Sequence, residues 1–216
     1  MIECLPGRDW ISAAAAATFA VLCSAVASAH PVSDQRLHDL MHRIDDAPGD
    51  AGLLVRRAEL YRERGDRAAA LADLRHASSL APGRIDVALA EGRLWLDAGW
   101  PARALDVLDR AVAGSPDDVG ARTVRARALA DVGRPLAAAA DLTRALAQCG
   151  PTRLPQPELY FERARLLASA GNAHLQEALD GLEEGLALLG PVAVLESKAD
   201  EIRRKLDRAS RAADER

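Results

Sequence analysis

Aromatic side chains are scarce in this chain of 216 residues: phenylalanine, tyrosine and tryptophan together make up 3% of it. Hydrophobic residues nevertheless make up 49%, so a core has to be built from alanine, leucine and valine, which favours helices packed on helices. The net charge is only −4, whereas a general nucleic-acid binder normally carries a basic surface. The composition therefore predicts an all-α protein that has no nucleic-acid partner.

Recognisable catalytic motifs are also missing. The chain contains no Gly-x-Ser-x-Gly, no phosphate-binding glycine loop, no Cys-x-x-Cys and no His-Glu-x-x-His. Adjacent carboxylates, such as Asp45 with Asp46, fall at expected turns or on exposed faces, where solvation explains them. We therefore predict that the protein is not an enzyme and uses no cofactor.

The N-terminal stretch differs in composition from the rest. Residues 11–26 form an alanine-rich apolar run, and Ala27-Ser28-Ala29 is the small-x-small pattern that signal peptidase cuts. We predict a signal peptide over residues 1–29, cleavage near Ala29 and a periplasmic or secreted protein that begins at His30. The alternative is an uncleaved membrane anchor through residues 11–29, which is just long enough to span a bilayer. A membrane would be a partner only in that case.

Cysteine is too rare for a disulfide framework. Cys4 and Cys23 leave with the predicted signal peptide, so Cys149 stands alone. One thiol cannot form an internal disulfide, and the mature protein has to hold together by packing. We interpret Cys149 as a small apolar residue at a helix end.

What the chain does contain is a pattern that returns every 34 residues between Ala51 and Gly150. Each unit holds two helical patterns, predicted in the first unit at about residues 52–64 and 67–80, with a helix-ending glycine between them. Small columns allow close helix approach, and large columns fill the space beside them. The matching columns are Ala58, Gly92, Ala126; Tyr61, Trp95, Leu129; Gly65, Gly99, Gly133; Ala70, Ala104, Ala138; Leu74, Leu108, Leu142; Ala77, Ala111, Ala145; and Pro82, Pro116, Gly150.

These columns resemble the tetratricopeptide repeat, a 34-residue helix-turn-helix unit, over about residues 51–190. The resemblance implies a right-handed superhelical solenoid of four repeats, residues 51–84, 85–118, 119–152 and 157–190, with terminal capping helices. Two columns depart from the family: Leu54, Ala88, Arg122 early in the first helix, and Arg57, Glu91, Arg125 before the small column. We expect these departures to weaken individual helix contacts.

The flanks of the repeats fit the role of caps. Residues 30–50 predict an N-terminal capping helix that starts at Ser33 as N-cap. Residues 191–216 predict an amphipathic C-terminal capping helix and a frayed, highly charged tail. Within the repeats, Asp66 is a predicted N-cap, and Pro101 and Pro135 are predicted first-turn residues.

The resemblance also implies a function, because the first helix of each repeat in this family lines a concave groove that binds a protein or peptide. The groove column contains Arg93, Arg127 and Arg165, which are suited to carboxylates of an acidic segment. Alternatively, Arg93, Arg127 and Arg165 pair with Asp97, Asp131 and neighbouring acids at helical spacing. The predicted apolar ground of the groove consists of Leu89, Leu96 and Phe161.

Trp100 is a second candidate contact with a partner. It stands in a turn between Gly99 and Pro101, where it is either an exposed aromatic anchor or folds over the next turn near Arg134. Trp95, in the aromatic column, is predicted to be core.

Three histidines near the predicted mature N-terminus suggest a different function. His38 and His42 lie four residues apart on the predicted capping helix, and His30 is the predicted first residue. Such a pair can share a metal ion. The alternative to a non-catalytic scaffold is therefore a periplasmic metal-binding accessory protein.

Overall fold

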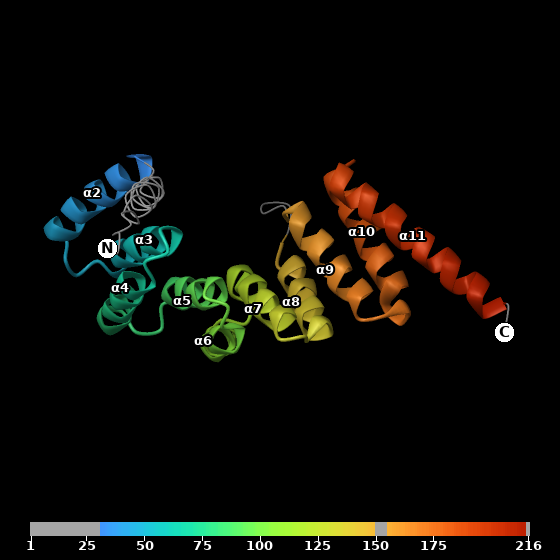
Figure 1. The fold of residues 1–216 in the computed structure, drawn as a ribbon, viewed down its shortest axis with the longest axis horizontal. Helices are drawn as coiled ribbons and strands as arrows, with labels where there is room; N and C mark the ends of the chain where they lie inside the picture. Colours follow the sequence, from blue (N-terminus) through green and yellow to red (C-terminus); the bar gives the residue numbers. More distant parts are fainter. Residues whose placement is uncertain (1–30, 150–154, 215–216) are drawn as a thin grey trace, which may run out of the picture. The chain divides into compact units, whose positions relative to one another are not determined.

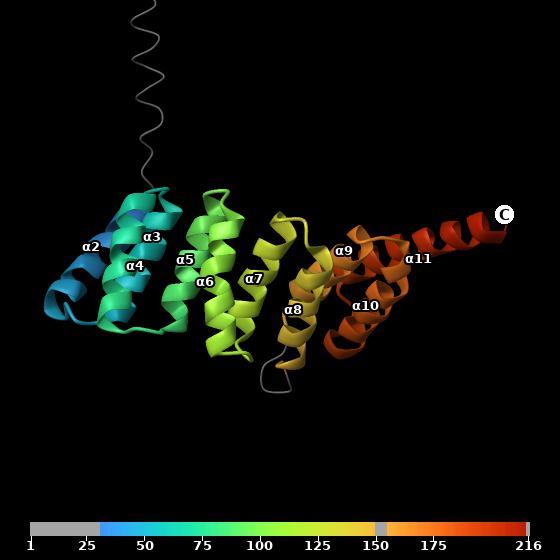
Figure 2. The ribbon, with the colours of Figure 1, turned by 90° about the horizontal axis from the view of Figure 1, so that it is seen from below.

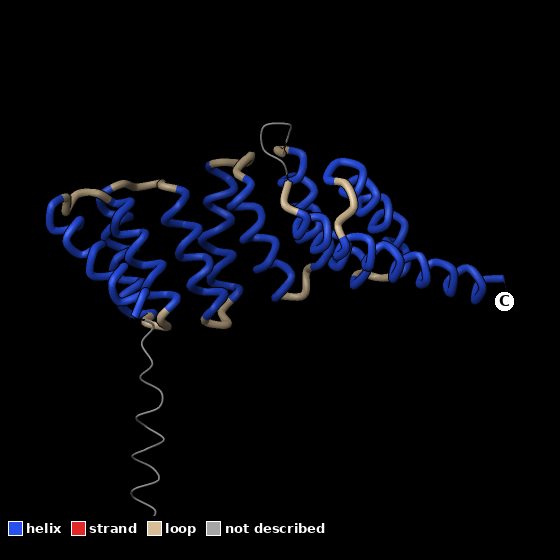
Figure 3. The backbone as a smooth tube through the Cα atoms, turned by 90° about the horizontal axis from the view of Figure 1, so that it is seen from above, coloured by secondary structure: helices blue, strands red, loops and turns tan. Residues whose placement is uncertain are grey.

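The computed structural model describes residues 31–149 and 155–214, and these residues form helices joined by turns and contain no strand (Figure 3). The predicted signal peptide and His30 lie outside the described residues. The chain divides into two units, one up to Asp46 and one from Ala47 onward. No helix in the described part is both long and apolar enough to cross a membrane.

The first unit contains one described helix, α2 (Pro31–Asp46). It begins two residues before Ser33, so Ser33 lies inside the helix and the predicted N-cap is wrong. A proline is well tolerated at the first helical position, because it lacks only an N–H that would have no partner there.

In its described residues, the second unit forms four successive helix pairs and a final long helix (Figures 1 and 2). The first two helices lie within one residue of the predicted 52–64 and 67–80. The short 3₁₀ helix η1 (Asn172–His174) accommodates the two extra residues of the last pair. The pairs are α3 (Ala51–Glu63) with α4 (Arg67–Leu80), α5 (Ile85–Asp97) with α6 (Pro101–Gly114), α7 (Val119–Asp131) with α8 (Pro135–Ala147), and α9 (Pro157–Ser169) with α10 (Leu175–Leu189), followed by α11 (Ala193–Asp214).

Local sequence sets the ends of these helices. The repeated turn glycines adopt positive φ, such as 77° at Gly65, a conformation that residues with a Cβ adopt at a cost. The Asp66 side chain accepts a hydrogen bond from the backbone N–H of Ala69 at 3.1 Å, as predicted for an N-cap. Pro101 and Pro135 stand at the starts of α6 and α8, as predicted.

The core lies between the helices of each pair and between successive pairs. The small column is fully enclosed, since Ala70, Ala104 and Ala138 are 0% exposed. The second helix of each pair packs against the first helix of the next: α4 on α5, α6 on α7, and α8 on α9. Helix α11 packs against α9 and α10 through the buried Leu195 and Ile202, so it covers the end of the last pair.

The arginines that depart from the family pattern make ion pairs across the helix pair, whereas we expected these departures to weaken helix contacts. Arg57 of α3 makes two hydrogen bonds of 2.7 Å to the carboxylate of Asp73 on α4. In the third pair, Arg122 and Arg125 of α7 both bind Asp141 of α8, which is only 3% exposed. These ion pairs join the two helices of a repeat, because a carboxylate on the second helix faces each arginine.

A candidate partner-binding groove

The groove arginine Arg93 is held by a neighbouring repeat. Its Nη1 lies 3.1 Å from Oε1 of Glu59, which is 34 residues earlier and occupies the equivalent position on α3. Glu59 also accepts a hydrogen bond of 2.6 Å from Nε of Arg62, and Arg62 binds Asp97 of α5. Burial alone would lower the pKa of Arg62, but its hydrogen bonds to the two acids outweigh burial and raise it.

The predicted pairing of Arg93 with Asp97 on the same helix is therefore wrong. Asp97 binds Arg62 and not Arg93, because α3 and α5 lie side by side and bring equivalent positions together. For Arg165 the predicted pairing with a neighbouring acid on its own helix is confirmed, since its Nη2 lies 2.6 Å from Oε2 of Glu162. In the described part of the chain, Arg127 makes no hydrogen bond or ion pair through its side chain, which is exposed.

Arg127 and Arg165 line one pocket, of about 400 Å³, between α7 and α9. Its remaining walls are apolar surface from Ala126, Ala130, Leu142, Leu159 and Leu166, polar side chains of Thr123 and Gln156, and the acids Asp131, Glu158 and Glu162. The three carboxylates outnumber the two guanidinium groups, so the pocket has mixed charge and is not a purely basic surface.

A second pocket, of about 390 Å³, adjoins the first, since Thr123, Gln156 and Leu159 line both. Arg93 stands at this second pocket together with Val119, Gly120, Val124, Cys149 and Pro155. We call the two joined pockets the α7 groove, because α7 forms part of both. The three predicted arginines thus all line this pair of adjacent pockets.

Sequence reasoning missed Gln156 and Leu159 of this groove. Both lie at the start of α9, directly after the insertion that separates the third and fourth repeats. The sequence signal that could have found them is Gln156 between Pro155 and Pro157. The two prolines stiffen the backbone at the start of α9, and Gln156 carries a polar side chain there. In the described residues the Gln156 amide makes no hydrogen bond, so it is available to a peptide backbone.

The three residues predicted to form the apolar surface of the groove lie outside the α7 groove. Leu89 and Leu96 are partly buried against the core between the second and third pairs. Phe161 packs against the last core cluster, with Nζ of Lys198 from α11 5.8 Å from its ring centre. None of these three side chains lines the α7 groove.

Trp100 packs within its own repeat and stays half exposed, at 48%. Its ring stacks on that of Trp95, with centroids 5.7 Å apart, and the Arg103 guanidinium carbon lies 4.1 Å from its centre. Trp95 is only partly buried, which corrects its prediction as core, and its Nε1 donates to Glu91 at 3.1 Å.

His38 and His42 of α2 face each other. Their Nε2 atoms are 3.1 Å apart and their rings meet edge to face. No cluster of three or more potential metal ligands occurs within residues 31–149 and 155–214. The structure thus brings together two of the three predicted histidines, and the third lies outside the described residues.

Comparison with solved structures identifies the helix-pair architecture. The chain superimposes on TTC0263, a thermophilic TPR protein of Thermus thermophilus, with a TM-score of 0.61 and 20% identity, over 86% of this chain and 95% of that one. The chain has the tetratricopeptide repeat (TPR) fold. The predicted fold class is therefore confirmed.

Two further TPR structures show the same likeness. PilW, described as a type IV pilus biogenesis factor, matches with a TM-score of 0.62 and 20% identity, over 81% of this chain and 84% of PilW. YrrB, described as a TPR protein with an unusual peptide-binding site, matches with a TM-score of 0.60 and 18% identity, over 78% of this chain and 84% of YrrB. No protein-family model matches the chain, and no curated protein matches its sequence.

Proposed function

We propose that this TPR protein is a non-catalytic scaffold that binds an extended segment of a partner protein in the α7 groove. The observation that carries the proposal is Arg127, which lines the groove and has no charged partner in the described chain, whereas Arg93 and Arg165 are paired. An unpaired guanidinium beside apolar surface is suited to a single carboxylate of the bound segment.

The charges of the α7 groove indicate which kind of partner segment would bind. Asp131, Glu158 and Glu162 would repel a run of acidic residues, so we propose a segment with one carboxylate at Arg127 and neutral or basic residues beside it. Apolar side chains of the segment would lie over Leu159 and its neighbours. The likeness to TPR proteins, one of them described by its peptide-binding site, supports a protein-interaction role.

The test uses a library of displayed ten-residue peptides that vary in the number and position of acidic residues, selected on protein that begins at His30. Selected peptides are then measured by fluorescence polarisation on four proteins. Arg127→Ala should weaken binding about tenfold or more, with weaker salt dependence than wild type, because a charge-assisted contact of ~1.5–3 kcal/mol is lost. Thr123→Trp should abolish binding, because Thr123 lines both halves of the groove.

The matched control is Arg144→Ala, which removes an exposed arginine on α8 that lines neither half of the groove. It should bind as wild type does. Equal binding by wild type and by the Thr123 variant would overturn the groove as the site. Loss in the Thr123 variant with no change in the Arg127 variant would overturn the carboxylate contact alone.

We also propose that the protein is exported and loses residues 1–29, on the basis of the apolar run and the Ala27-Ser28-Ala29 pattern. The intact mass of the protein recovered from the cell envelope tests this. A species that begins at His30 is expected, and a full-length species in the membrane fraction would favour the anchor through residues 11–29.

The second candidate function is metal binding, which the geometry of His38 and His42 favours. Two imidazole nitrogens that share one ion at ~2.0–2.1 Å lie roughly 3 Å apart, and the two Nε2 atoms are 3.1 Å apart. Calorimetric titration of the mature protein with zinc should show one site that His38→Ala removes. Deletion of residues 30–49 should abolish zinc binding and leave groove binding unchanged, and zinc binding equal to wild type in either variant would rule this pair out.

A further inference from the structure

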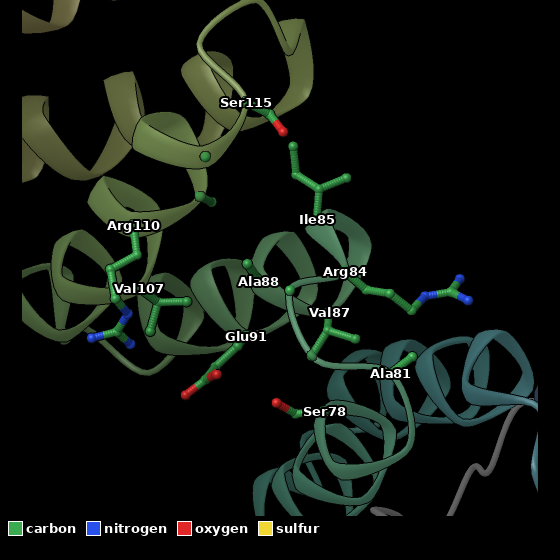
Figure 4. A pocket seen from close by; sticks show the side chains of 13 residues that line it. Ser78, Ala81, Arg84, Ile85, Val87, Ala88, Glu91, Val107, Arg110 and Ser115 are labelled. Atoms are coloured by element: carbon green, nitrogen blue, oxygen red, sulfur yellow. The ribbon is translucent and has the colours of Figure 1, made fainter.

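Another pocket lies where the first helix pair meets the second (Figure 4). Its volume is about 370 Å³, and its walls come from the end of α4 with the following loop, from α5 and from the second half of α6. Small residues line much of it, among them Ala81, Gly83, Ala88 and Ala111. We call it the junction pocket.

The repeat pattern explains why this space is open. The fourth residue of the first helix is large in three of the repeats, and those side chains are buried: Leu54 is 1% exposed, Arg122 5% and Tyr160 2%. In the second repeat the equivalent residue is Ala88, which lines the junction pocket. A methyl group leaves unfilled the volume that a large side chain takes up elsewhere.

The last repeat shows how an aromatic ring occupies the equivalent position. The ring of Tyr160 packs directly on Gly185 of α10, since a Cβ built on Gly185 would lie 2.8 Å from it. The equivalent of Gly185 in the second repeat is Ala111, which lines the junction pocket beside Ala88. The open space in the second repeat therefore corresponds to the place of the Tyr160 ring.

The polar groups at the pocket carry opposite charges. Glu91 and Arg110 lie toward the same wall as Val107 (Figure 4). Glu91 accepts one hydrogen bond, from Trp95 Nε1 at 3.1 Å, and neither Glu91 nor Arg110 makes an ion pair in the described part of the chain. In the first and third repeats the equivalent of Glu91 is an arginine that binds an aspartate, as in the pairs Arg57–Asp73 and Arg125–Asp141.

A neutral group that both donates and accepts fits between these two charges, whereas a charged occupant would be repelled by one of them. A phenol hydroxyl donates to a carboxylate and accepts from a guanidinium. We propose that the junction pocket receives a tyrosine side chain of a partner protein, with the ring over Ala88 and Ala111 and the hydroxyl between Glu91 and Arg110. The junction pocket and the α7 groove share no lining residue.

The experiment is a titration of the mature, isotopically labelled protein with p-cresol, the side-chain analogue of tyrosine, followed by NMR. We expect saturable shifts of the methyl signals of Val87 and Val107 and of the Trp95 indole N–H, which Glu91 links to the pocket. Toluene, which lacks the hydroxyl, should bind several-fold more weakly. The absence of saturable shifts at these signals, up to the solubility of p-cresol, would overturn the proposal.

The deciding variant is Ala88→Leu, which gives the second repeat the residue of the first. It should raise the melting temperature and abolish the p-cresol shifts, while groove peptides bind as before. If that variant does not fold, Ala111→Leu fills the pocket from α6 instead. The matched control is Ala102→Leu, since Ala102 is exposed at the start of α6. If p-cresol still shifts these signals in a folded variant whose pocket is filled by leucine, it binds elsewhere, and the proposal is overturned.

Discussion

Asp141→Ala should destabilise the repeats strongly, because it removes the carboxylate that two arginines share. Asp141 accepts hydrogen bonds from Nη1 of Arg122 at 2.9 Å and from Nε and Nη2 of Arg125 at 2.6 and 2.7 Å. The Arg122 side chain is only 6% exposed, so its guanidinium cannot turn to water. After the substitution Arg122 would retain its hydrogen bond to the Pro116 carbonyl, but no opposite charge.

The magnitude follows from this burial. Removal of one partner of a buried ion pair costs about 3–5 kcal/mol, because the remaining charge stays desolvated. The equivalent Asp73→Ala in the first repeat should cost roughly 1–2 kcal/mol, since the Arg57 side chain is 21% exposed and can be hydrated. Arg122→Leu should be neutral or stabilising, because it removes the buried charge and leaves Asp141 paired with Arg125.

Urea unfolding followed by far-UV circular dichroism measures these differences. An unchanged slope of free energy against urea concentration would show that the variants and the wild type unfold between comparable states. A loss below about 1 kcal/mol for Asp141→Ala, the range of exposed ion pairs, would refute the argument from burial. Equal losses of unfolding free energy in Asp141→Ala and Asp73→Ala would refute the argument that exposure of the arginine sets the cost.

Three further substitutions test separate parts of the fold. Gly185→Ala should destabilise by about 1–3 kcal/mol in a thermal melt, because the added methyl meets the Tyr160 ring, and a cost below about 0.5 kcal/mol would contradict that packing. Hydrogen bonds from two lysines lower the pKa of Glu201 from 4.5 to about 2, so its contribution to stability is present above about pH 4.5 and is lost as the pH falls toward 2. Glu201→Gln should flatten the stability profile in that window by less than ~1 kcal/mol, since the side chain is exposed, and an unchanged profile would contradict it. Trp100→Ala should remove the coupled-indole circular dichroism signal of its stacked pair while stability falls by about 1 kcal/mol or less, and a persistent signal would contradict the stacking.

Much of the fold was predictable because it is local and periodic. The glycine of each turn, the aspartate and proline residues at helix starts and the small columns all act through their neighbours in the chain. That is why α3 and α4 match the predicted ranges within one residue, and why Ala70 and its equivalents are enclosed. The start of α2 was missed because Ser33 and Pro31 both favour a helix start, and the pattern alone does not rank them.

The candidate site was predictable only in part. Arg93, Arg127 and Arg165 do line the α7 groove, because they occupy equivalent positions on successive first helices, with the insertion before α9 between Arg127 and Arg165. Which of the three has a charged partner did not follow, since the ion pairs depend on rotamers and on neighbouring helices. Gln156 entered the groove through an insertion that breaks the period.

By itself, the sequence determined the repeat length, the bounds of the helix pairs and the residues that enclose the core, because these depend on short-range periodicity and turn chemistry. Only the tertiary structure decided which charges meet and where space is left open. Arg93 meets Glu59, 34 residues away, and Asp141 holds two arginines of the facing helix. The junction pocket arises because the neighbours of Ala88 do not close over it, which is a property of packing between helices rather than of any one segment.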